Sequence, residues 1–438
     1  MAELPRFGAD ADFLLHDRLR GFPAGHAPIA AGRLGELGLK PFDGAMQLPL
    51  ISLDLTAFDA NAALMLRYVQ EQGVAIAPHA KTPMSPALAR RLVEAGAWGT
   101  TVADIRQASV MLASGLTRLI IANEIGGHAS AKRLAAVLAG HAAAEIFIFA
   151  DTPELVEALA AAWAEHSDLP RLGILAELGL ARGGARTLEA ATAVADAALA
   201  RESPRFRLAG VAAYEGAAVT PDPAETRERI GRLMAMTGDL LAAVRARVGT
   251  ERPLVVTAGG SVYFDLVVKA LQPAIAGDGR ATLVLRSGAI FFHDHGVYDR
   301  GLKGLDARGG FVLDGQPVAA AAVFRPALRL WAEVLSRPEP GLAVCGMGHR
   351  DVAIDQGYPR PLALYRDGRR ISDLAGATVS KLNDQHAFLD AAENLGIEVG
   401  DVVEFGISHP CTCLDRHAVV YGLDETQTAT TAFPTSFG

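Results

Sequence analysis

The chain has few cysteines, no long apolar run and no excess of positive charge. Its three cysteines, Cys345, Cys411 and Cys413, are too few to build a disulfide framework in a protein of 438 residues. The last two are also too close in sequence for a relaxed bridge. Thiol or metal chemistry is therefore the better use for them.

Two classes of partner are excluded by what is missing. No stretch of about 18 uninterrupted apolar residues could form a transmembrane helix. The N-terminus opens with Glu3, Arg6, Asp10 and Asp12 instead of the basic flank and apolar core of a signal peptide. The 41 Lys and Arg residues against 49 Asp and Glu give a net charge of −8, which repels nucleic acid. We expect a cytoplasmic protein that acts on a small molecule and binds neither membranes nor nucleic acid.

From residue 74 to residue 288 the sequence alternates short β-branched runs with longer helical patterns, which predicts repeated βα units around a parallel sheet. Helix starts are recognisable, for example at Ser85 followed by Pro86, where the serine oxygen can cap free N–H groups. The candidate strands begin at Val74, Thr100, Arg118, Glu145, Leu172, Leu208, Leu254 and Thr282. Eight such runs predict an α/β fold with a (β/α)8 TIM-type barrel.

A second, β-rich unit is predicted after about residue 300, where short β runs and turns replace the βα rhythm. An earlier strand-like run at residues 48–55 lies outside that rhythm, and we assign it to the same β unit. The predicted division is an N-terminal arm at 1–45 that packs with the β domain, a barrel domain at 46–303 and a C-terminal β domain at 304–438.

Polar residues gather at the carboxyl ends of the predicted strands, where parallel barrels place their chemistry. Strand ends meet solvent, and for a single residue this alternative explanation has about even odds. The coincidence across seven strands weakens it. After five of these strands the residues concerned are His79, Lys81, Thr82, Asn123, Glu124, Asp151, Glu177, Arg182 and Tyr214, and after the last two they are residues 259–261 and 286–288.

Two glycine-containing turns follow the last two predicted strands. Residues 257–261 read Thr-Ala-Gly-Gly-Ser and residues 286–289 read Arg-Ser-Gly-Ala. Glycines allow backbone N–H groups to approach a phosphate closely, and barrels often hold a phosphate between their last two strands. The predicted phosphate-binding residues are Gly259, Gly260, Ser261, Gly288 and Ala289.

Several motifs resemble one family. Residues 77–82, Ala-Pro-His-Ala-Lys-Thr, resemble the Pro-His-x-Lys-Thr motif of D-serine dehydratases and D-threonine aldolases, a branch of the alanine racemase-like (fold-type III) pyridoxal phosphate enzymes. Residues 177–184 are similar to a loop that places an arginine near the cofactor, and residues 210–216 resemble Gly-Val-x-x-Tyr-x-Gly. Residues 408–411, Ser-His-Pro-Cys, resemble the dehydratase metal pair, where the aldolases have His-x-Asp.

With residues 381–386, these motifs make the chain similar to bacterial amino acid deaminases of the D-serine dehydratase type over roughly residues 15–430. The sequence departs from many relatives at Ala77 and Pro83, where they carry arginine and histidine, and from some at Leu178, where they carry aspartate.

The resemblance implies a set of site residues. Lys81 binds pyridoxal 5′-phosphate covalently, His79 and Arg182 join it as catalytic residues, and Asn123 and Tyr214 contact the cofactor. From the residue alone, a lysine held at a barrel mouth can have its ammonium destabilised by burial. The alternative is an ordinary solvated loop lysine. Glu177 and Arg286 are weaker candidates.

The same resemblance implies that His409 and Cys411 bind Zn²⁺, with Mn²⁺ or another divalent ion as alternatives. Two protein ligands leave positions open for substrate. Without the resemblance, a capped turn with a buried thiol would be the preferred interpretation. Strand alternation would put Cys413 on the same face as Cys411, as a spare thiol. His386 could orient a metal ligand or be purely structural.

We therefore predict a pyridoxal phosphate- and zinc-dependent lyase that dehydrates a D-β-hydroxy amino acid, most simply D-serine, to a 2-oxo acid and ammonia. The first alternative is an aldolase that cleaves a D-3-hydroxy amino acid, such as D-threonine, to glycine and an aldehyde. Racemisation and a non-catalytic pyridoxal phosphate-binding protein are further alternatives. Relatives of this fold pair head to tail, so a homodimer is expected; a fully active monomer in solution would contradict it.

Overall fold

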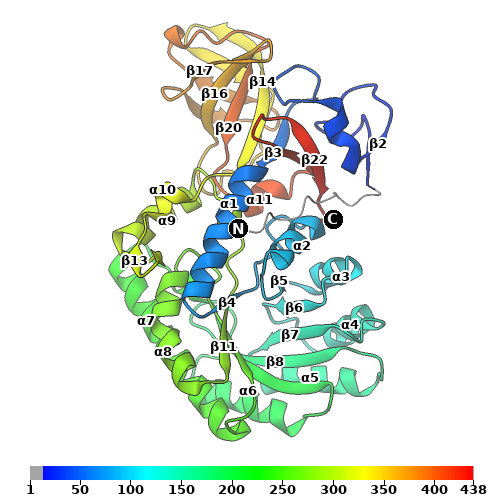
Figure 1. Ribbon diagram of the computed structural model, residues 1–438, viewed down its shortest axis with the longest axis vertical. Coiled ribbons are helices and arrows are strands. Elements are labelled where there is room, and N and C mark those ends of the chain that lie inside the picture. Colours follow the sequence, from blue (N-terminus) through cyan, green and yellow to red (C-terminus); the bar gives the residue numbers. More distant parts are fainter. Residues whose placement is uncertain (1–12, 438) are drawn as a thin grey trace.

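The computed structural model describes residues 13–437. A βα unit forms one end of the molecule, and a β domain, coloured yellow to red, forms the other (Figure 1). Glu3, Arg6, Asp10 and Asp12, which support the expected location, lie outside the described residues.

The βα unit is built on an eight-stranded parallel sheet in the order β4-β11-β10-β9-β8-β7-β6-β5. All eight predicted runs are strands of this sheet. Their bounds are β4 (Ala75–Ile76), β5 (Thr100–Val102), β6 (Arg118–Ile121), β7 (Glu145–Ala150), β8 (Arg171–Leu178), β9 (Phe206–Ala213), β10 (Leu254–Thr257) and β11 (Ala281–Leu285).

Backbone hydrogen bonds between the β4 and β5 segments close the sheet on itself. Trp98 N donates to Ile76 O at 2.8 Å, Thr101 N donates to Pro78 O at 3.0 Å, and Ala80 N donates to Thr101 O at 2.8 Å. The predicted TIM-type barrel is confirmed. The seam runs through residues 78–80, so the chain leaves the barrel directly into Lys81.

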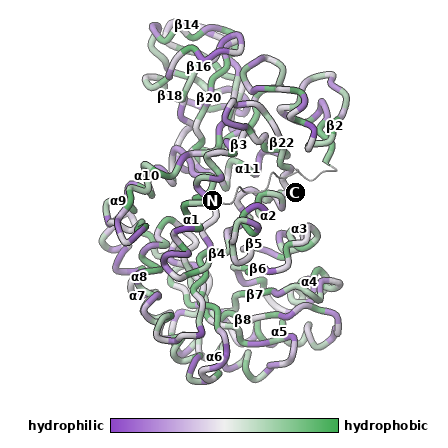
Figure 2. The backbone as a smooth tube through the Cα atoms, viewed as in Figure 1, coloured by the Kyte–Doolittle hydropathy of each residue, from purple (hydrophilic) through white to green (hydrophobic). Residues whose placement is uncertain are grey.

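Helices surround the barrel strands, and hydrophobic and hydrophilic residues alternate along them (Figure 2). The helix α1 (Leu55–Glu71) precedes β4. The others are α2 (Pro86–Glu94), α3 (Ile105–Ala113), α4 (His128–Leu138), α5 (Pro153–Ala164), α6 (Leu188–Ala200), α7 (Pro223–Val248), α8 (Phe264–Asp278), the short η2 (Glu215–Ala218) and η3 (Ala289–Phe291), and α9 (Val297–Ala307).

The start of α2 differs in one detail from the expectation. Pro86 does occupy its first turn, where a missing N–H group costs nothing. The Ser85 hydroxyl, however, makes no cap bond and is buried without a hydrogen-bond partner. The sequence pattern therefore located the helix start correctly but assigned the wrong stabilising contact.

Apolar side chains fill the barrel interior. Ile120, Phe147, Phe149, Leu175 and Val255 belong to one buried cluster inside the strands. A packed interior leaves no room for a ligand within the barrel, so a binding site must lie at its mouth, as in other parallel barrels.

The β domain is a large, mostly antiparallel sheet. Its strands are β14 (Leu328–Glu339), β15 (Leu342–Cys345), β16 (Arg360–Arg366), β17 (Arg369–Asp373), β18 (Thr378–Leu382), β19 (Ala387–Asp390), β20 (Val402–Gly406), β21 (Val419–Leu423) and β22 (Ala429–Pro434). The strand β3 (Leu50–Asp54) pairs with β14 and β21, so the early run belongs to this sheet, as assigned. The short elements η4 (Glu393–Leu395) and α11 (Pro410–Leu414) connect its strands. The hairpin of β12 (Val312–Leu313) and β13 (Gln316–Pro317) is a separate two-stranded sheet, and it lies with α10 (Ala320–Val323) beside α1 and α9.

The segment before β3 packs on the β domain. It contains β1 (Leu14–Leu15), β2 (Ile29–Ala30) and η1 (Ala31–Leu37). The Phe42 ring stacks on Tyr365 with 4.4 Å between centroids and also contacts Trp331. These contacts hold the segment on the sheet, away from the barrel strands.

Candidate active site

The loop that carries Lys81 leaves the barrel at its seam. The isolated bridge between His79 and Thr101 fixes the backbone two residues before Lys81. Thr82 follows it and is buried, and the chain then enters α2 at Pro86. Lys81 is thus the residue at which a rigid strand end meets the barrel mouth.

Lys81 itself is exposed, contrary to the expectation that it is buried. Its side chain forms no hydrogen bond or ion pair with any other residue from 13 to 437. This is the exposure of one chain alone. The predicted head-to-tail second subunit would cover the barrel mouth, and that dimer stays a prediction.

His79 lies beneath the loop with an unusual polar environment. Its Nδ1 atom is buried and has no hydrogen-bond partner. Burial, followed by the positive charges of Lys81 and Arg286, lowers the pKa of His79 well below its usual range. The ring is therefore neutral at neutral pH, and one of its nitrogens is buried without a partner.

The turn at Gly288 and Ala289 lies against the same backbone. A Cβ atom at Gly288 would come within 2.5 Å of the His79 carbonyl oxygen, so only glycine fits there. Ala289 begins η3, whose first amides have no partner within so short a helix. Among the described residues, no carboxylate occupies these amides.

The other predicted phosphate turn is already filled by a carboxylate of the chain. Glu215 Oε2 accepts from the amides of Gly259 at 2.8 Å and Gly260 at 3.3 Å. Its Oε1 accepts from the amide and hydroxyl of Ser261 at 2.9 and 2.7 Å. Glu215 is fully buried. The expectation of an open phosphate cradle at residues 259–261 is thus wrong for this geometry, because its donors are satisfied by Glu215.

Arg182 and Tyr214 meet above the barrel. The Arg182 guanidinium lies 4.5 Å from the centre of the Tyr214 ring. A Cβ atom at Gly216 would collide with that ring at 2.4 Å, so the glycine lets the tyrosine fold back over its own loop. Asn123 is exposed and its amide donates only to Ala103 O at 3.3 Å. The first two side chains form a platform, whereas Asn123 lies at its edge.

A carboxyl pair and an arginine lie deeper. Arg286 is buried and donates to Thr257 Oγ1 at 2.7 Å and to Ala213 O at 2.9 Å. Glu177, at the end of β8, is also buried and hydrogen-bonds to Glu124. Burial, then the hydrogen bond and charge of Glu124, raise the pKa of Glu177 to about 9, although Arg286 and Arg182 oppose the shift. At neutral pH the pair holds a proton.

Glu177→Gln is expected to increase thermal stability at pH 9 relative to the unmodified chain, with less effect at pH 5. The folded-state pKa lies above the ordinary value of 4.5, so the stability that the proton provides is full below about pH 4.5 and is lost as the pH rises through 9. Glutamine cannot ionise. Melting temperatures at both pH values test this, with the exposed Glu393→Gln as the control. If the melting temperature of Glu177→Gln minus that of the parent is no larger at pH 9 than at pH 5, the prediction is contradicted.

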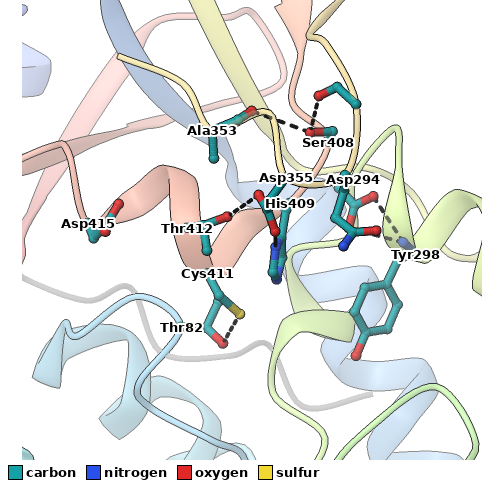
Figure 3. Close-up of polar contacts among 12 residues, drawn as sticks. Thr82, Asp294, Tyr298, Ala353, Asp355, Ser408, His409, Cys411, Thr412 and Asp415 are labelled. Atoms are coloured by element: carbon teal, nitrogen blue, oxygen red, sulfur yellow. Dashed lines mark hydrogen bonds and ion pairs between the residues drawn. The ribbon is translucent and has the colours of Figure 1, made fainter. Parts of the chain in front are cut away.

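The predicted metal pair comes from the β domain and reaches the Lys81 loop. Cys411 Sγ lies 3.2 Å from Thr82 Oγ1, a hydrogen-bond contact between the two domains. Figure 3 shows His409 and Cys411 above Thr82, with Asp355 beside the imidazole. His409 is the N-cap residue of α11 and Cys411 lies in its first turn, which places both side chains at one end of this short helix.

His409 and Cys411 each stabilise the charged form of the other, so their pKa values shift in opposite directions. Burial alone would lower the pKa of His409, but the hydrogen bond and charge of Cys411, followed by those of Asp355, raise it to about 9. Burial would raise the pKa of Cys411, yet hydrogen bonds from His409 and Thr82 and the charges of His409 and Lys81 lower it. A thiolate is the form of cysteine that binds metals.

Two further predicted residues are not part of this arrangement. His386 is exposed in the turn between β18 and β19, where it lines an open surface groove with His349 and Asp384. No hydrogen bond among the described residues links it to His409 or Cys411, so the suggestion that it orients a metal ligand stays a prediction. Cys413 is buried against Asp351 O at 3.7 Å. It lies in helix α11, so the argument from strand alternation does not apply.

Sequence reasoning missed three residues near the site. Tyr298, in the first turn of α9, is buried, and this burial, followed by the charges of Cys411 and Asp294, raises its pKa well above the usual range. Asp355 bonds to His409 from a loop, and Glu215 fills the glycine turn. The run His-Asp-His at 293–295 just before Tyr298 was the available signal for it.

The residues present fit both groups that the sequence implies. For pyridoxal phosphate, the mouth offers an amine without a partner at Lys81, a platform at Arg182 and Tyr214, and the backbone cradle at Gly288. For zinc, His409 and Cys411 provide one nitrogen and one thiolate. Within residues 13–437, no group of three or more His, Cys, Asp or Glu side chains is arranged to hold a metal. Any metal would therefore have an open coordination sphere.

Comparison with known proteins identifies both domains. Residues 53–261 match the alanine racemase N-terminal domain, and residues 327–423 match a putative serine dehydratase domain. These matches cover seven of the eight barrel strands and most of the β domain, including His409 and Cys411. The chain is an alanine racemase-like, fold-type III pyridoxal phosphate enzyme. Within that class it combines the racemase barrel with the serine dehydratase domain, as the motifs indicated.

Several characterised proteins are similar over most of the chain. A D-threonine aldolase from Arthrobacter sp. is 26% identical over 77% of this chain and 78% of its own length. A 3-hydroxy-D-aspartate aldolase from Paracoccus denitrificans is 27% identical over 72% and 76%. A D-threo-3-hydroxyaspartate dehydratase from Delftia sp. is 26% identical over 53% and 65%.

Solved structures give the same fold. The D-threonine aldolase from Filomicrobium marinum has a TM-score of 0.69 at 25% identity, covering 89% of this chain and 95% of that one. The Delftia dehydratase has a TM-score of 0.67 at 21% identity, covering 90% and 98%. Aldolases and dehydratases are both lyases, so the prediction of a pyridoxal phosphate-dependent lyase is confirmed at that level.

No helix in the described part of the chain is long and apolar enough to span a bilayer.

Proposed function

We propose that the chain is a pyridoxal phosphate- and zinc-dependent dehydratase of a D-3-hydroxy amino acid, which yields a 2-oxo acid and ammonia. The observation that carries the proposal is the 3.2 Å contact between Thr82 Oγ1 and Cys411 Sγ. It joins the lysine loop to the metal pair, so one substrate can be reached by both.

Pyridoxal phosphate, when bound, accepts the electrons of a bond broken at Cα. In our proposal the freed Lys81 amine removes the Cα proton, since the lysine is unpaired at the mouth. That electron pair becomes the Cα–Cβ double bond while the Cβ–O pair leaves with hydroxide. The released enamine takes up water and yields the oxo acid and ammonia. Arg182 and Tyr214 hold the ring, and the Gly288 turn binds the phosphate.

His409 and Cys411 would hold the metal. A Lewis acid at this position assists the departure of hydroxide, which is otherwise a poor leaving group. Two protein ligands would leave room on the metal for the hydroxyl and carboxylate of a substrate.

One similar protein supports dehydration, and others support the main alternative, aldol cleavage. The Delftia relative is a dehydratase of a D-3-hydroxy amino acid, and a cysteine-to-alanine variant of it was solved in a metal-free form. The Arthrobacter and Paracoccus relatives are aldolases. Aldol cleavage needs a base on the β-hydroxyl instead of its loss, and gives glycine.

Product identity is the test. D-Serine, D-threonine and D-3-hydroxyaspartate, with their L-enantiomers as controls, are incubated with the cofactor-loaded enzyme and zinc. We expect oxo acid and ammonia in equal amounts from the D-isomers. D-Threonine is the most informative substrate because dehydration gives 2-oxobutanoate and cleavage gives glycine and acetaldehyde. Glycine as the main product would replace the dehydratase by an aldolase, and no product with any substrate would favour a non-catalytic binding protein.

A further inference from the structure

Asp355 bonds to the metal pair without belonging to it. It lies in the loop between β15 and β16, beside the imidazole of His409 (Figure 3). Its Oδ2 atom is 2.6 Å from His409 Nδ1. Its Oδ1 atom accepts a hydrogen bond from Thr412 Oγ1 at 2.8 Å. Both carboxylate oxygens are thus used, and the imidazole is held from one side.

The contact with Asp355 determines which ring nitrogen of His409 remains available to bind a metal. An ionised carboxylate only accepts hydrogen bonds, so Nδ1 must carry the proton in this pair. The other ring nitrogen, Nε2, is then the one that can donate a lone pair to a metal. Metal-binding histidines commonly have a carboxylate or carbonyl on their second nitrogen for this reason.

Cys411 has a separate contact. Its thiol lies 3.2 Å from Thr82 Oγ1, whereas Nδ1 of His409 is engaged with Asp355. Asp355 therefore uses only one of the two ring nitrogens. Thr412, between His409 and the end of α11, anchors the carboxylate to the same helix and restricts its rotation.

We propose that Asp355 is a positioning residue that holds His409 by Nδ1 and presents Nε2, together with Cys411 Sγ, to the metal. The inference rests on the proposed function and deepens it. It also accounts for why Asp355 is not itself a third ligand: both of its oxygens are occupied, one on the imidazole and one on Thr412.

Metal affinity measured apart from catalysis tests the proposal. The cofactor-loaded full-length protein is stripped with a chelator and titrated with Co²⁺, whose near-ultraviolet charge-transfer band reports a bound thiolate. Zinc affinity follows from competition with a chromogenic chelator. We expect Asp355→Ala to weaken zinc binding roughly 10 to 100-fold. Asp355→Asn should lose less, since its amide oxygen can still accept from Nδ1–H.

Asp415→Ala is the matched control. Asp415 is an exposed carboxylate at the end of the same helix, and its ion pair is with Arg416 instead of His409. It should bind both metals like the parent protein, and the visible absorbance of the cofactor should be the same in every variant.

The outcomes separate this proposal from the proposed function. A parent protein that binds neither Co²⁺ nor Zn²⁺ would remove the metal from the function itself. If the parent binds both metals and the Asp355→Ala and Asp355→Asn variants bind them as tightly as the parent, the role of Asp355 is overturned and the proposed function stays intact. If Asp355→Ala does not fold, Asp355→Asn decides by the same criterion.

Discussion

Lys81→Ala abolishes turnover and covalent cofactor attachment in our account. Lys81 is the unpaired amine at the barrel mouth, directly after the seam that fixes residues 78–80. Removing a group that both attaches the cofactor and transfers the proton should lower kcat/KM by roughly 10⁴-fold or more. Borohydride reduction followed by peptide mass spectrometry should find the cofactor on Lys81 of the parent protein and no attached cofactor in the Lys81→Ala variant.

The control for this variant is Lys269→Ala, which removes an exposed lysine on α8. It should keep the labelled peptide and the activity of the parent. If Lys81→Ala still carries covalently reduced cofactor and still turns over substrate, another lysine performs the chemistry and the assignment of this loop is wrong.

His409→Ala and Cys411→Ser should separate metal chemistry from cofactor binding. Both residues belong to the β domain, and neither contributes to the Gly288 turn or the Arg182–Tyr214 platform. We expect both variants to retain the cofactor absorbance. Oxo acid formation should fall on the order of 10² to 10³-fold, the rate equivalent of several kcal/mol of Lewis-acid stabilisation.

A chelator should reproduce this loss in the parent protein, and added zinc should reverse it. Cys413→Ser is the matched control, because Cys413 lies in the same helix but is buried against Asp351. Full activity of the parent after complete metal removal would show that hydroxide leaves without a Lewis acid. The His409–Cys411 pair would then be structural.

The parts of the fold that depend on local pattern could be predicted from the sequence. Buried strands of a parallel barrel are short β-branched runs, and each of the eight runs became a strand. The position of Lys81 followed from a contiguous motif. Even the run at residues 48–55 was assigned to the correct sheet, since it broke the βα rhythm before β4.

The parts that depend on contacts between distant residues could not be predicted. Glu215 fills the turn at residues 259–261 from 44 positions earlier in the sequence, and nothing in a Gly-Gly-Ser turn reveals that its donors are taken. Asp355 is 54 residues from His409. For Cys413, Pro410 at the start of α11 allows a helical turn where alternation had suggested a strand.

The most direct test of the central claim, that one site combines the Lys81 cofactor with a metal on His409 and Cys411, is a crystal structure of the cofactor-loaded protein grown with zinc, with anomalous data collected at the zinc edge. Our account predicts one anomalous peak per chain, bonded to Cys411 Sγ and to Nε2 of His409, on the side that faces Lys81. A peak elsewhere, or none at this pair in crystals that contain the cofactor, would contradict it.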